Sequence, residues 1–238
     1  MRHTLLLFAL LISTVSACKS RPEAPVETAA TNASVKASGA SESAPNEENL
    51  RFGQAIEPGP TSADGLAVAT FAGGCFWCME PPFDEVEGVV STTSGYTGGP
   101  ETAPSYEQVA SGRTGHTESV LVLYDPGVVT YEELLGVFWR SHDPTDASGQ
   151  FADRGAQYRP AIFYHSPEQE QAAIASRDAL AASAKFEKPI AVEIVAAETF
   201  WPAEAYHQDF YKKKPTHYKR YRRGSGRDAF LDEHWGTP

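Results

Sequence analysis

Gly-Gly-Cys-Phe-Trp-Cys, at residues 73–78, is the most informative stretch of this chain. It follows the apolar run 66–71, which indicates a buried strand, and it leads into residues 79–83, so we expect the cysteine to lie at a helix start. Two glycines allow backbone conformations closed to other residues, so the chain can turn sharply here. The free N–H groups of a helix N-terminus favour a thiolate, so we expect the pKa of Cys75 to lie below the ordinary value of about 8.5.

Cys78 follows Cys75 by about one helical turn, so its sulfur could reach that of Cys75. The chain has three cysteines in all, and only these two stand together on a turn. In an exported protein this spacing suggests a dithiol that alternates between reduced and disulfide forms, because a disulfide that closes so short a loop adds little stability. A pair of buried structural cysteines is the alternative.

The N-terminus predicts export. A short polar start is followed by an apolar run at residues 5–12, too short to span a membrane, and then by small residues before Cys18. This pattern is typical of a bacterial lipobox. We expect residues 1–17 to be a signal peptide and Cys18 to carry the lipid, which anchors the protein to a bacterial membrane on its periplasmic or outer-membrane side. Ordinary signal cleavage after Ala17 is the alternative.

Composition divides the rest of the chain. Residues 19–50 contain no aromatic residue and are dominated by Ala, Ser, Glu and Pro, so residues 18–64 are predicted to form a disordered tether. The remainder, 65–238, has the size of one domain, which we expect to be a monomer. A formal net charge of −11 argues against general nucleic-acid binding.

The domain alternates strand and helix patterns. An amphipathic helix is expected after Thr130, an N-cap with Glu133 at the capping-box position. The order predicts a two-layer α+β sandwich. The last forty or so residues are predicted to be irregular, with at most a short helix near 203–211. The other expected elements are strands at 66–71, 89–96, 118–124, 160–165 and 190–196, and helices at 80–87 and 166–185.

Several polar residues could carry chemistry, although each signal is weak alone. Glu118 begins a strand, Tyr106 lies upstream of it, and Asp153 and Tyr158 share a loop that contains glycine. A lone Glu at a strand edge is usually solvated, and a lone Tyr is usually a core or rim residue. Asp153 beside Arg154 would ordinarily form a surface pair.

Taken together with the cysteines, these residues resemble the A-type peptide methionine sulfoxide reductases. The resemblance covers roughly residues 66–220, and its Gly-Cys-Phe-Trp motif is highly specific. It implies a ferredoxin-like core with a mixed β-sheet. The motifs that carry the resemblance are Gly-Cys-Phe-Trp at 74–77, Gly-Tyr-Thr-Gly-Gly at 95–99, Gly-His-Thr-Glu at 115–118, His-Asp-Pro-Thr at 142–145 and Asp-Arg-Gly-Ala-Gln-Tyr-Arg at 153–159.

The resemblance also implies roles. Cys75 would attack the sulfoxide sulfur and become a sulfenic acid, and Glu118 would protonate the sulfoxide oxygen. Tyr106 and Tyr158 would donate hydrogen bonds to that oxygen, and Asp153 would help through water or by orientation. A sulfoxide sulfur is a poor electrophile until its oxygen is protonated, so an acid must face the thiolate.

Phe76 and Trp77 would wall an apolar site for the substrate's methyl group, and plain core packing is the alternative for both. Many family members have Gly where Cys78 stands and resolve the sulfenic acid with a cysteine in a C-terminal tail. Here residues 224–238 contain no cysteine, so we expect Cys78 to be the resolver.

The implied activity is repair of the S epimer of methionine sulfoxide, free or in proteins, with electrons from a thioredoxin-like reductant and no metal, flavin or nicotinamide. A thioredoxin-type thiol–disulfide oxidoreductase is the first alternative, although the usual Trp before the first cysteine is absent. The second alternative is a lipoprotein binding module in which the two cysteines form a permanent disulfide. His116 and His142 do not make a zinc site with the cysteines, because the Cys-rich second half of such a site is missing.

Overall fold

The computed structural model describes residues 52–62 and 65–236. Its strands form a six-stranded sheet in the order β7-β6-β1-β3-β2-β8 and a small β4-β5 pair. In chain order the elements are β1 (Ala67–Ala72), α1 (Phe76–Asp84), β2 (Val89–Thr97), α2 (Tyr106–Ala110), β3 (Thr117–Tyr124), α3 (Tyr131–Trp139), β4 (Gly149–Gln150), β5 (Asp153–Arg154), the 3₁₀ helix η1 (Ala156–Tyr158), β6 (Ala161–Tyr164), α4 (Pro167–Ala182), β7 (Glu193–Ala196), β8 (Trp201–Pro202), α5 (Phe210–Lys213), α6 (Pro215–Ser225) and α7 (Arg227–Trp235).

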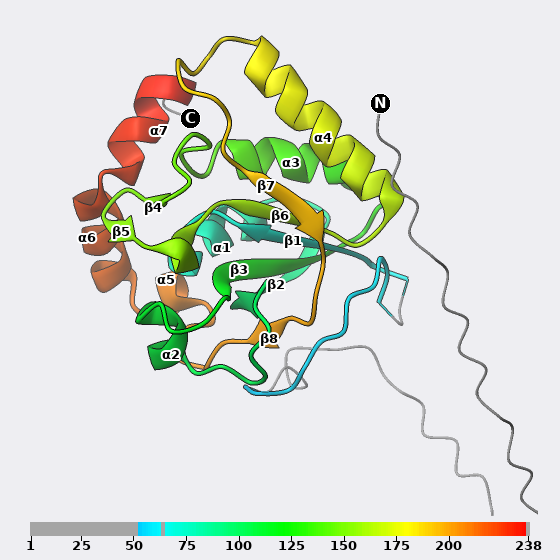
Figure 1. The fold of residues 1–238 in the computed structure, drawn as a ribbon, viewed down its shortest axis with the longest axis vertical. Helices are drawn as coiled ribbons and strands as arrows, with labels where there is room; N and C mark the ends of the chain where they lie inside the picture. Colours follow the sequence, from blue (N-terminus) through cyan, green and yellow to red (C-terminus); the bar gives the residue numbers. More distant parts are fainter. Residues whose placement is uncertain (1–51, 63–64, 237–238) are drawn as a thin grey trace, which may run out of the picture. The chain divides into compact units, whose positions relative to one another are not determined.

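The four inner strands confirm the ferredoxin-like core. They lie in the order β6-β1-β3-β2, every neighbouring pair is antiparallel, and the segments between β1 and β2 and between β3 and β6 carry α1 and α3. The sheet is mixed because β7 pairs parallel to β6. The fold is therefore the predicted α+β sandwich (Figure 1).

The central strand β1 is buried along its whole length, and its alternate side chains pack into hydrophobic clusters on opposite faces of the sheet. Phe71 stacks on Phe83 of α1 and Phe138 of α3 on one face. Val68 faces the other way and packs with Leu123 and its neighbours. One face of the sheet is thus covered by helices.

Local signals for the covering helices are confirmed. Thr130 caps α3, and its side chain and that of Glu133 form the predicted capping box. Ser166 caps α4, with Pro167 in the first turn. α1 begins at Phe76, earlier than the expected 80–87, because the turn containing Cys75 already bonds to the Cys78 N–H.

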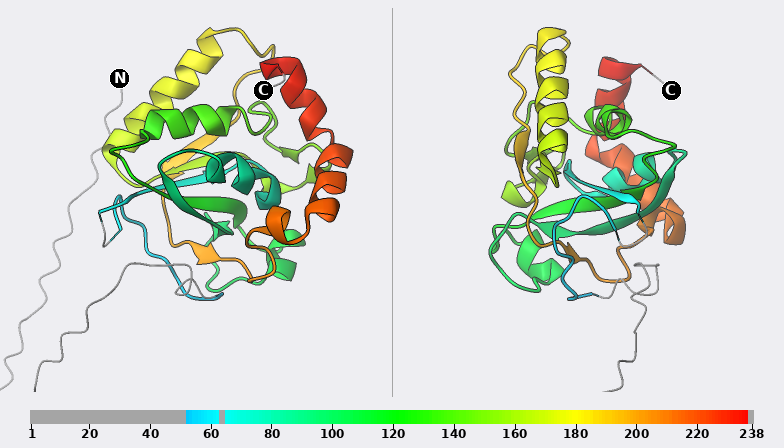
Figure 2. Two further views of the ribbon diagram at one scale, coloured as in Figure 1. Left: turned by 180° about the vertical axis from the view of Figure 1, so that it is seen from behind. Right: turned by 90° about the vertical axis from the view of Figure 1, so that its right-hand side faces the viewer.

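Two predictions about the ends of the domain are wrong. The C-terminal segment is helical, since α6 and α7 follow one another along one side of the domain (Figure 2). Residues 52–62, assigned to the tether, include Ile56. It forms an isolated antiparallel β-bridge with Phe200 and packs against buried residues on the face of the sheet opposite Phe71. The described part of the fold therefore starts before residue 65.

The predicted signal peptide at 1–17 and the lipidation site Cys18 lie outside the described residues. Within the described ranges, no helix combines the length and the apolar character that crossing a bilayer requires.

Candidate active site

The turn after β1 places Cys75 at the N-cap of α1. Gly74 has φ +87°, and a Cβ there would lie 2.5 Å from Cβ of Gln150, so only glycine fits. The Cys78 N–H donates to the Cys75 carbonyl over 2.9 Å, which begins the first turn of the helix. Both cysteines are free thiols and are buried, with Cys75 6% exposed and Cys78 1%.

Sheet register brings Glu118 to this turn. β1 and β3 are antiparallel with Phe71 opposite Val120, so Glu118 lies just beyond the end of β1. Its Oε2 accepts a hydrogen bond of 3.1 Å from the Phe76 N–H, at the N-terminus of α1. Burial raises the pKa of Glu118 to about 8, against the lowering effect of that hydrogen bond. The carboxyl is therefore largely protonated at neutral pH beside Cys75.

The expectation of a low pKa at Cys75 is wrong for this arrangement. Burial raises the pKa of the Cys75 thiol, and Cys78 and Glu118 raise it further. The Phe76 N–H, which could have stabilised a thiolate, is taken by Glu118. The hydrogen bond between the side chains of Cys75 and Cys78 is the main cause that lowers the pKa of Cys78 to about 7. The two thiols are coupled and titrate as a pair.

The two tyrosines approach the same place from different elements. Tyr106 opens α2 and Tyr158 ends η1. Burial raises the pKa of Tyr106 to about 12 and that of Tyr158 higher still, and the charges of Glu118 and Cys75 add to both shifts. Both phenols therefore keep their protons and can act as donors near the cysteine.

Asp153 of β5 completes the set of predicted polar residues. Burial raises the pKa of its carboxyl. Its charge contributes to the raised pKa of Glu118 and of Tyr158, so the fold brings Asp153 to the same group. The hydroxyl of Tyr221, on α6, donates a hydrogen bond to Asp153 Oδ2.

Phe76 and Trp77 differ in their surroundings. Phe76 is 1% exposed and packs in the main core against Tyr96 and His207. Trp77 is half-buried and stacks on Phe210, with ring centroids 3.8 Å apart. Its indole N–H donates to His207 Nδ1 over 3.0 Å. Burial lowers the pKa of His207 to about 4, so the ring is neutral and accepts this bond.

Comparison with known proteins identifies the family. The family model described as "Peptide methionine sulfoxide reductase" matches residues 67–238. The chain belongs to the peptide methionine sulfoxide reductases. It is 57% identical over 172 residues to the "Peptide methionine sulfoxide reductase MsrA" of Listeria innocua, a match that covers 72% of this chain and 97% of the relative.

Solved structures agree with this assignment. The reductase is similar to methionine sulfoxide reductase A of Corynebacterium diphtheriae, with 33% identity, a TM-score of 0.57 and coverage of 71% of this chain and 90% of the other. It is also similar to reduced Mxr1 of Saccharomyces cerevisiae, with 32% identity, a TM-score of 0.60 and coverage of 65% and 89%. The resemblance seen in the sequence is confirmed, and the protein is an oxidoreductase of the MsrA family.

Sequence reasoning missed two residues that the reductase brings to this site from its C-terminus. Besides Tyr221, Arg227 of α7 is 1% exposed, and its guanidinium donates to the carbonyls of Ser141 and Gly73. Its charge is one cause of the lowered pKa of Cys78. The only sequence signal was the run of Tyr and Arg in a segment predicted to be irregular.

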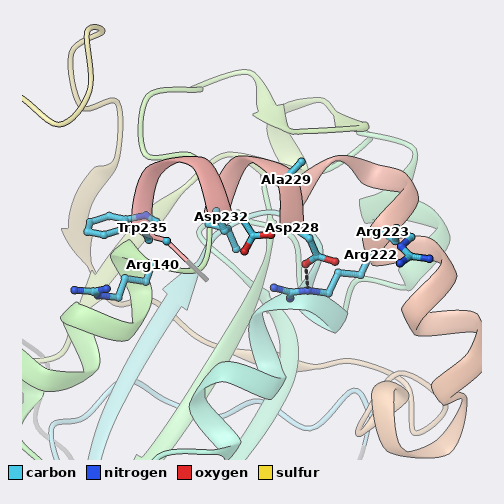
Figure 3. A pocket seen from close by; sticks show the side chains of 9 residues that line it. Arg140, Arg222, Arg223, Asp228, Ala229, Asp232 and Trp235 are labelled. Carbon is cyan, nitrogen blue, oxygen red and sulfur yellow. Dashed lines mark hydrogen bonds and ion pairs between the residues drawn. The ribbon is translucent and has the colours of Figure 1, made fainter. Parts of the chain in front are cut away.

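A separate hollow of about 850 Å³ lies along α7 (Figure 3). Side chains of both charges line it, with an ion pair of 2.6 Å between Arg222 and Asp228 at one end and Trp235 at the other. No predicted site residue lines it. Arg222, which lines this hollow, donates to the Cys78 carbonyl over 3.2 Å.

The side chains gathered at this site carry thiol, carboxyl and phenol groups. Among residues 52–62 and 65–236, no group of three or more His, Cys, Asp or Glu side chains could hold a metal ion. The reductase instead assembles two thiols, a neutral carboxylic acid, two phenol donors and a second carboxyl around one helix N-terminus.

Proposed function

We propose that this enzyme reduces the S epimer of methionine sulfoxide, free or in proteins, through a sulfenic acid on Cys75 that Cys78 resolves. The Cys75 sulfur takes the oxygen from the sulfoxide, so methionine leaves and Cys75 becomes a sulfenic acid. The Cys78 thiol then displaces that oxygen as water and forms a disulfide. One sulfoxide and two thiols give one thioether, one disulfide and one water.

The observation that carries the proposal is the hydrogen bond that the Phe76 N–H donates to the Glu118 carboxyl. The Glu118 carboxyl, whose pKa burial raises to about 8, shares the α1 N-terminus with Cys75, which supports its role as the acid. A substrate oxygen there would receive a proton as its sulfur is attacked, and Tyr106 and Tyr158 would stabilise the charge on that oxygen. Phe76 and Trp77 supply apolar surroundings for the methyl group.

Two observations support Cys78 as the resolver. The side chains of Cys75 and Cys78 are within hydrogen-bonding reach of each other. The only other cysteine of the sequence is Cys18. A thioredoxin-like dithiol protein would then return the disulfide to two thiols, because the enzyme must be reduced before it can turn over again.

The N-terminal sequence supports a location for this activity. A polar start, a short apolar run and small residues before Cys18 favour export and lipidation, with the domain held at a bacterial membrane. Growth with a radiolabelled fatty acid tests this: the wild-type chain would be labelled and sediment with membranes. A Cys18→Ser chain would carry no label, and equal labelling of both chains would contradict the proposal.

The separate epimers of a chromophore-labelled methionine sulfoxide, incubated with dithiothreitol, test the activity. The wild-type enzyme is expected to reduce the S epimer only, and Cys75→Ser to reduce neither. Cys78→Ser is expected to release one methionine per chain and then stop when only a large dithiol protein is supplied. Reduction of the R epimer, or turnover by Cys75→Ser, would contradict the proposal.

A further inference from the structure

The C-terminal helix α6 places a tyrosine hydroxyl between the nucleophile and a carboxyl. Tyr221 Oη donates to Asp153 Oδ2, and the same hydroxyl is within hydrogen-bonding reach of the Cys75 sulfur. The Tyr221 ring is held edge-on against Trp77, with centroids 5.7 Å apart. Cys75, Tyr221 and Asp153 thus form a continuous line of exchangeable protons.

Cys75 needs a proton acceptor. It is 6% exposed, and burial opposes its ionisation. Glu118 cannot accept that proton while it serves as the acid, because it is itself protonated. Cys78 lies beside Cys75 on the same helix, and Asp153 is the acceptor that Tyr221 connects to Cys75. Burial raises the pKa of Asp153, which makes its carboxylate a better acceptor. The titratable groups around Cys75 are Cys78 of α1, Tyr106 of α2, Glu118 of β3, Asp153 of β5, Tyr158 of η1 and Tyr221 of α6.

We propose that Tyr221 is a further catalytic residue, whose hydroxyl relays the Cys75 thiol proton to Asp153. As substrate binds, the S–H bond of Cys75 breaks and its proton passes to Tyr221 Oη. The Tyr221 proton passes at the same time to Asp153 Oδ2, which leaves a thiolate to attack the sulfoxide sulfur. Glu118 gives its proton to the oxygen, which leaves the substrate sulfur and becomes the sulfenic acid hydroxyl on Cys75. Asp153 afterwards releases its proton to solvent and Glu118 takes one up from solvent, so no proton is gained or lost.

The relay rests on the proposed function, because it describes how that nucleophile is activated. It gives the C-terminal helices a direct part in the reaction. It also distinguishes Tyr221 from Tyr211 of α5, whose hydroxyl donates to Asp84 over 2.6 Å, outside the group that surrounds Cys75. Tyr211→Phe is therefore a matched control, since it also removes a hydrogen bond from a tyrosine to a carboxylate.

The test is the single-turnover rate of methionine release by Tyr221→Phe, measured from pH 6 to pH 9. At pH 7 the rate is expected to fall by about 10² or more, the usual contribution of a positioned proton-transfer group. The loss should shrink as pH rises, because solvent then removes the Cys75 proton directly. The rate of Tyr211→Phe should match wild type at every pH.

Asp153→Asn is the second variant, in case Tyr221→Phe disturbs folding. It should show the same loss and pH trend, and the double variant should be no slower than the slower single variant. An unchanged rate in Tyr221→Phe, a loss equal at all pH values, or losses that multiply in the double variant would each overturn the relay. Failure of the proposed function is distinct, because wild-type enzyme would then release no methionine at all.

Discussion

Glu118 shows how one side chain acquires a role that its residue type does not predict. An ordinary glutamate is ionised at pH 7, with a pKa of about 4.3. Burial to 2% exposure raises its pKa to about 8, although the Phe76 N–H opposes the shift. Both effects come from its position at the start of β3, opposite the helix N-terminus that bears the cysteine.

Glu118→Gln should remove the acid while keeping the shape of the side chain. The single-turnover rate at pH 7 is expected to fall by about 10² or more, because the amide carries no acidic proton. Alkylation of Cys75 by iodoacetamide should persist and serves as the control for an intact thiol. Unchanged turnover would show that the proton comes from another group, with Asp153 the first to examine.

Loss of the same proton should give the wild-type rate an alkaline limit. The reaction uses the protonated form of Glu118, and its pKa is about 8, so the rate should decline as pH rises through that value. Single-turnover rates measured from pH 6 to pH 10 would show this limb. A rate that keeps rising to pH 10 would contradict a neutral Glu118 as the acid.

At the scale of residues, the sequence predicted which side chains the fold brings together, but it did not predict the pKa of the Cys75 thiol. The family motifs named Cys75, Glu118, Tyr158 and Asp153, and the fold brings them together from four elements. The thiol pKa was mispredicted because the competing use of the Phe76 N–H depends on strand register, which no local pattern shows.

At the scale of elements, α1 carries a buried glutamate, Glu80, which has no part in the proposed reaction. Glu80 is 1% exposed, and its Oε1 accepts a 3.0 Å bond from the Asp209 N–H, which ties α1 to the start of α5. Burial raises the pKa of Glu80 to about 8, and Asp84 and Asp209 add to the shift. The folded protein therefore holds this proton more tightly than the unfolded chain.

Glu80→Gln should flatten the pH dependence of stability. Because the folded pKa is raised, the stabilising contribution of the proton is complete below pH 4 and is lost as pH rises through about 8. Each such carboxyl makes the free energy of unfolding fall by at most about 1.4 kcal/mol per pH unit in that window. Urea denaturation at pH 5.5 and pH 8 should show a smaller fall for Glu80→Gln than for wild type.

Glu118→Gln is the comparison for that experiment, since Glu118 has a pKa shifted in the same direction. The double variant should show the smallest fall of all. Equal falls in the wild type and in Glu80→Gln would mean that Glu80 is ionised in the folded protein.

The C-terminal helices show why some elements escape local prediction. α6 has no buried residue and is rich in Lys and Arg, so it lacks the apolar face that normally indicates a helix. Contacts of α7 include those of Arg227, which donates to the Gly73 carbonyl, and of Trp235, over which Arg140 lies. Such long-range contacts have no signature in neighbouring residues. By contrast, the capping box at Thr130 was visible locally.

At the scale of the whole molecule, the N-terminal segment 52–62 closes the face of the sheet that has no helices. Its Ile56 packs with Val68, Leu121 and Phe200. The composition of the chain up to residue 64 predicted a tether throughout, because one half-buried isoleucine does not stand out among polar residues. The ferredoxin-like strand order, in contrast, followed from the family motifs spread along the domain.

Ile56→Ala should therefore lower stability without changing catalysis. The loss of a half-buried aliphatic side chain is expected to cost about 1–2 kcal/mol, below the range for fully buried sites. Phe52→Ala in the same segment is the control, because Phe52 is 50% exposed and should change stability by no more than about 0.5 kcal/mol. Equal effects on the urea midpoint would show that Ile56 does not hold this segment to the sheet.

The most direct test of the account is the thiol state of the enzyme after a single turnover without reductant. Reduced protein is mixed with excess S-epimer sulfoxide, quenched with an alkylating agent and digested for mass spectrometry. We expect one methionine released per chain and a peptide joined by a Cys75–Cys78 disulfide. A persistent sulfenic acid on Cys75, with Cys78 alkylated as a free thiol, would contradict it.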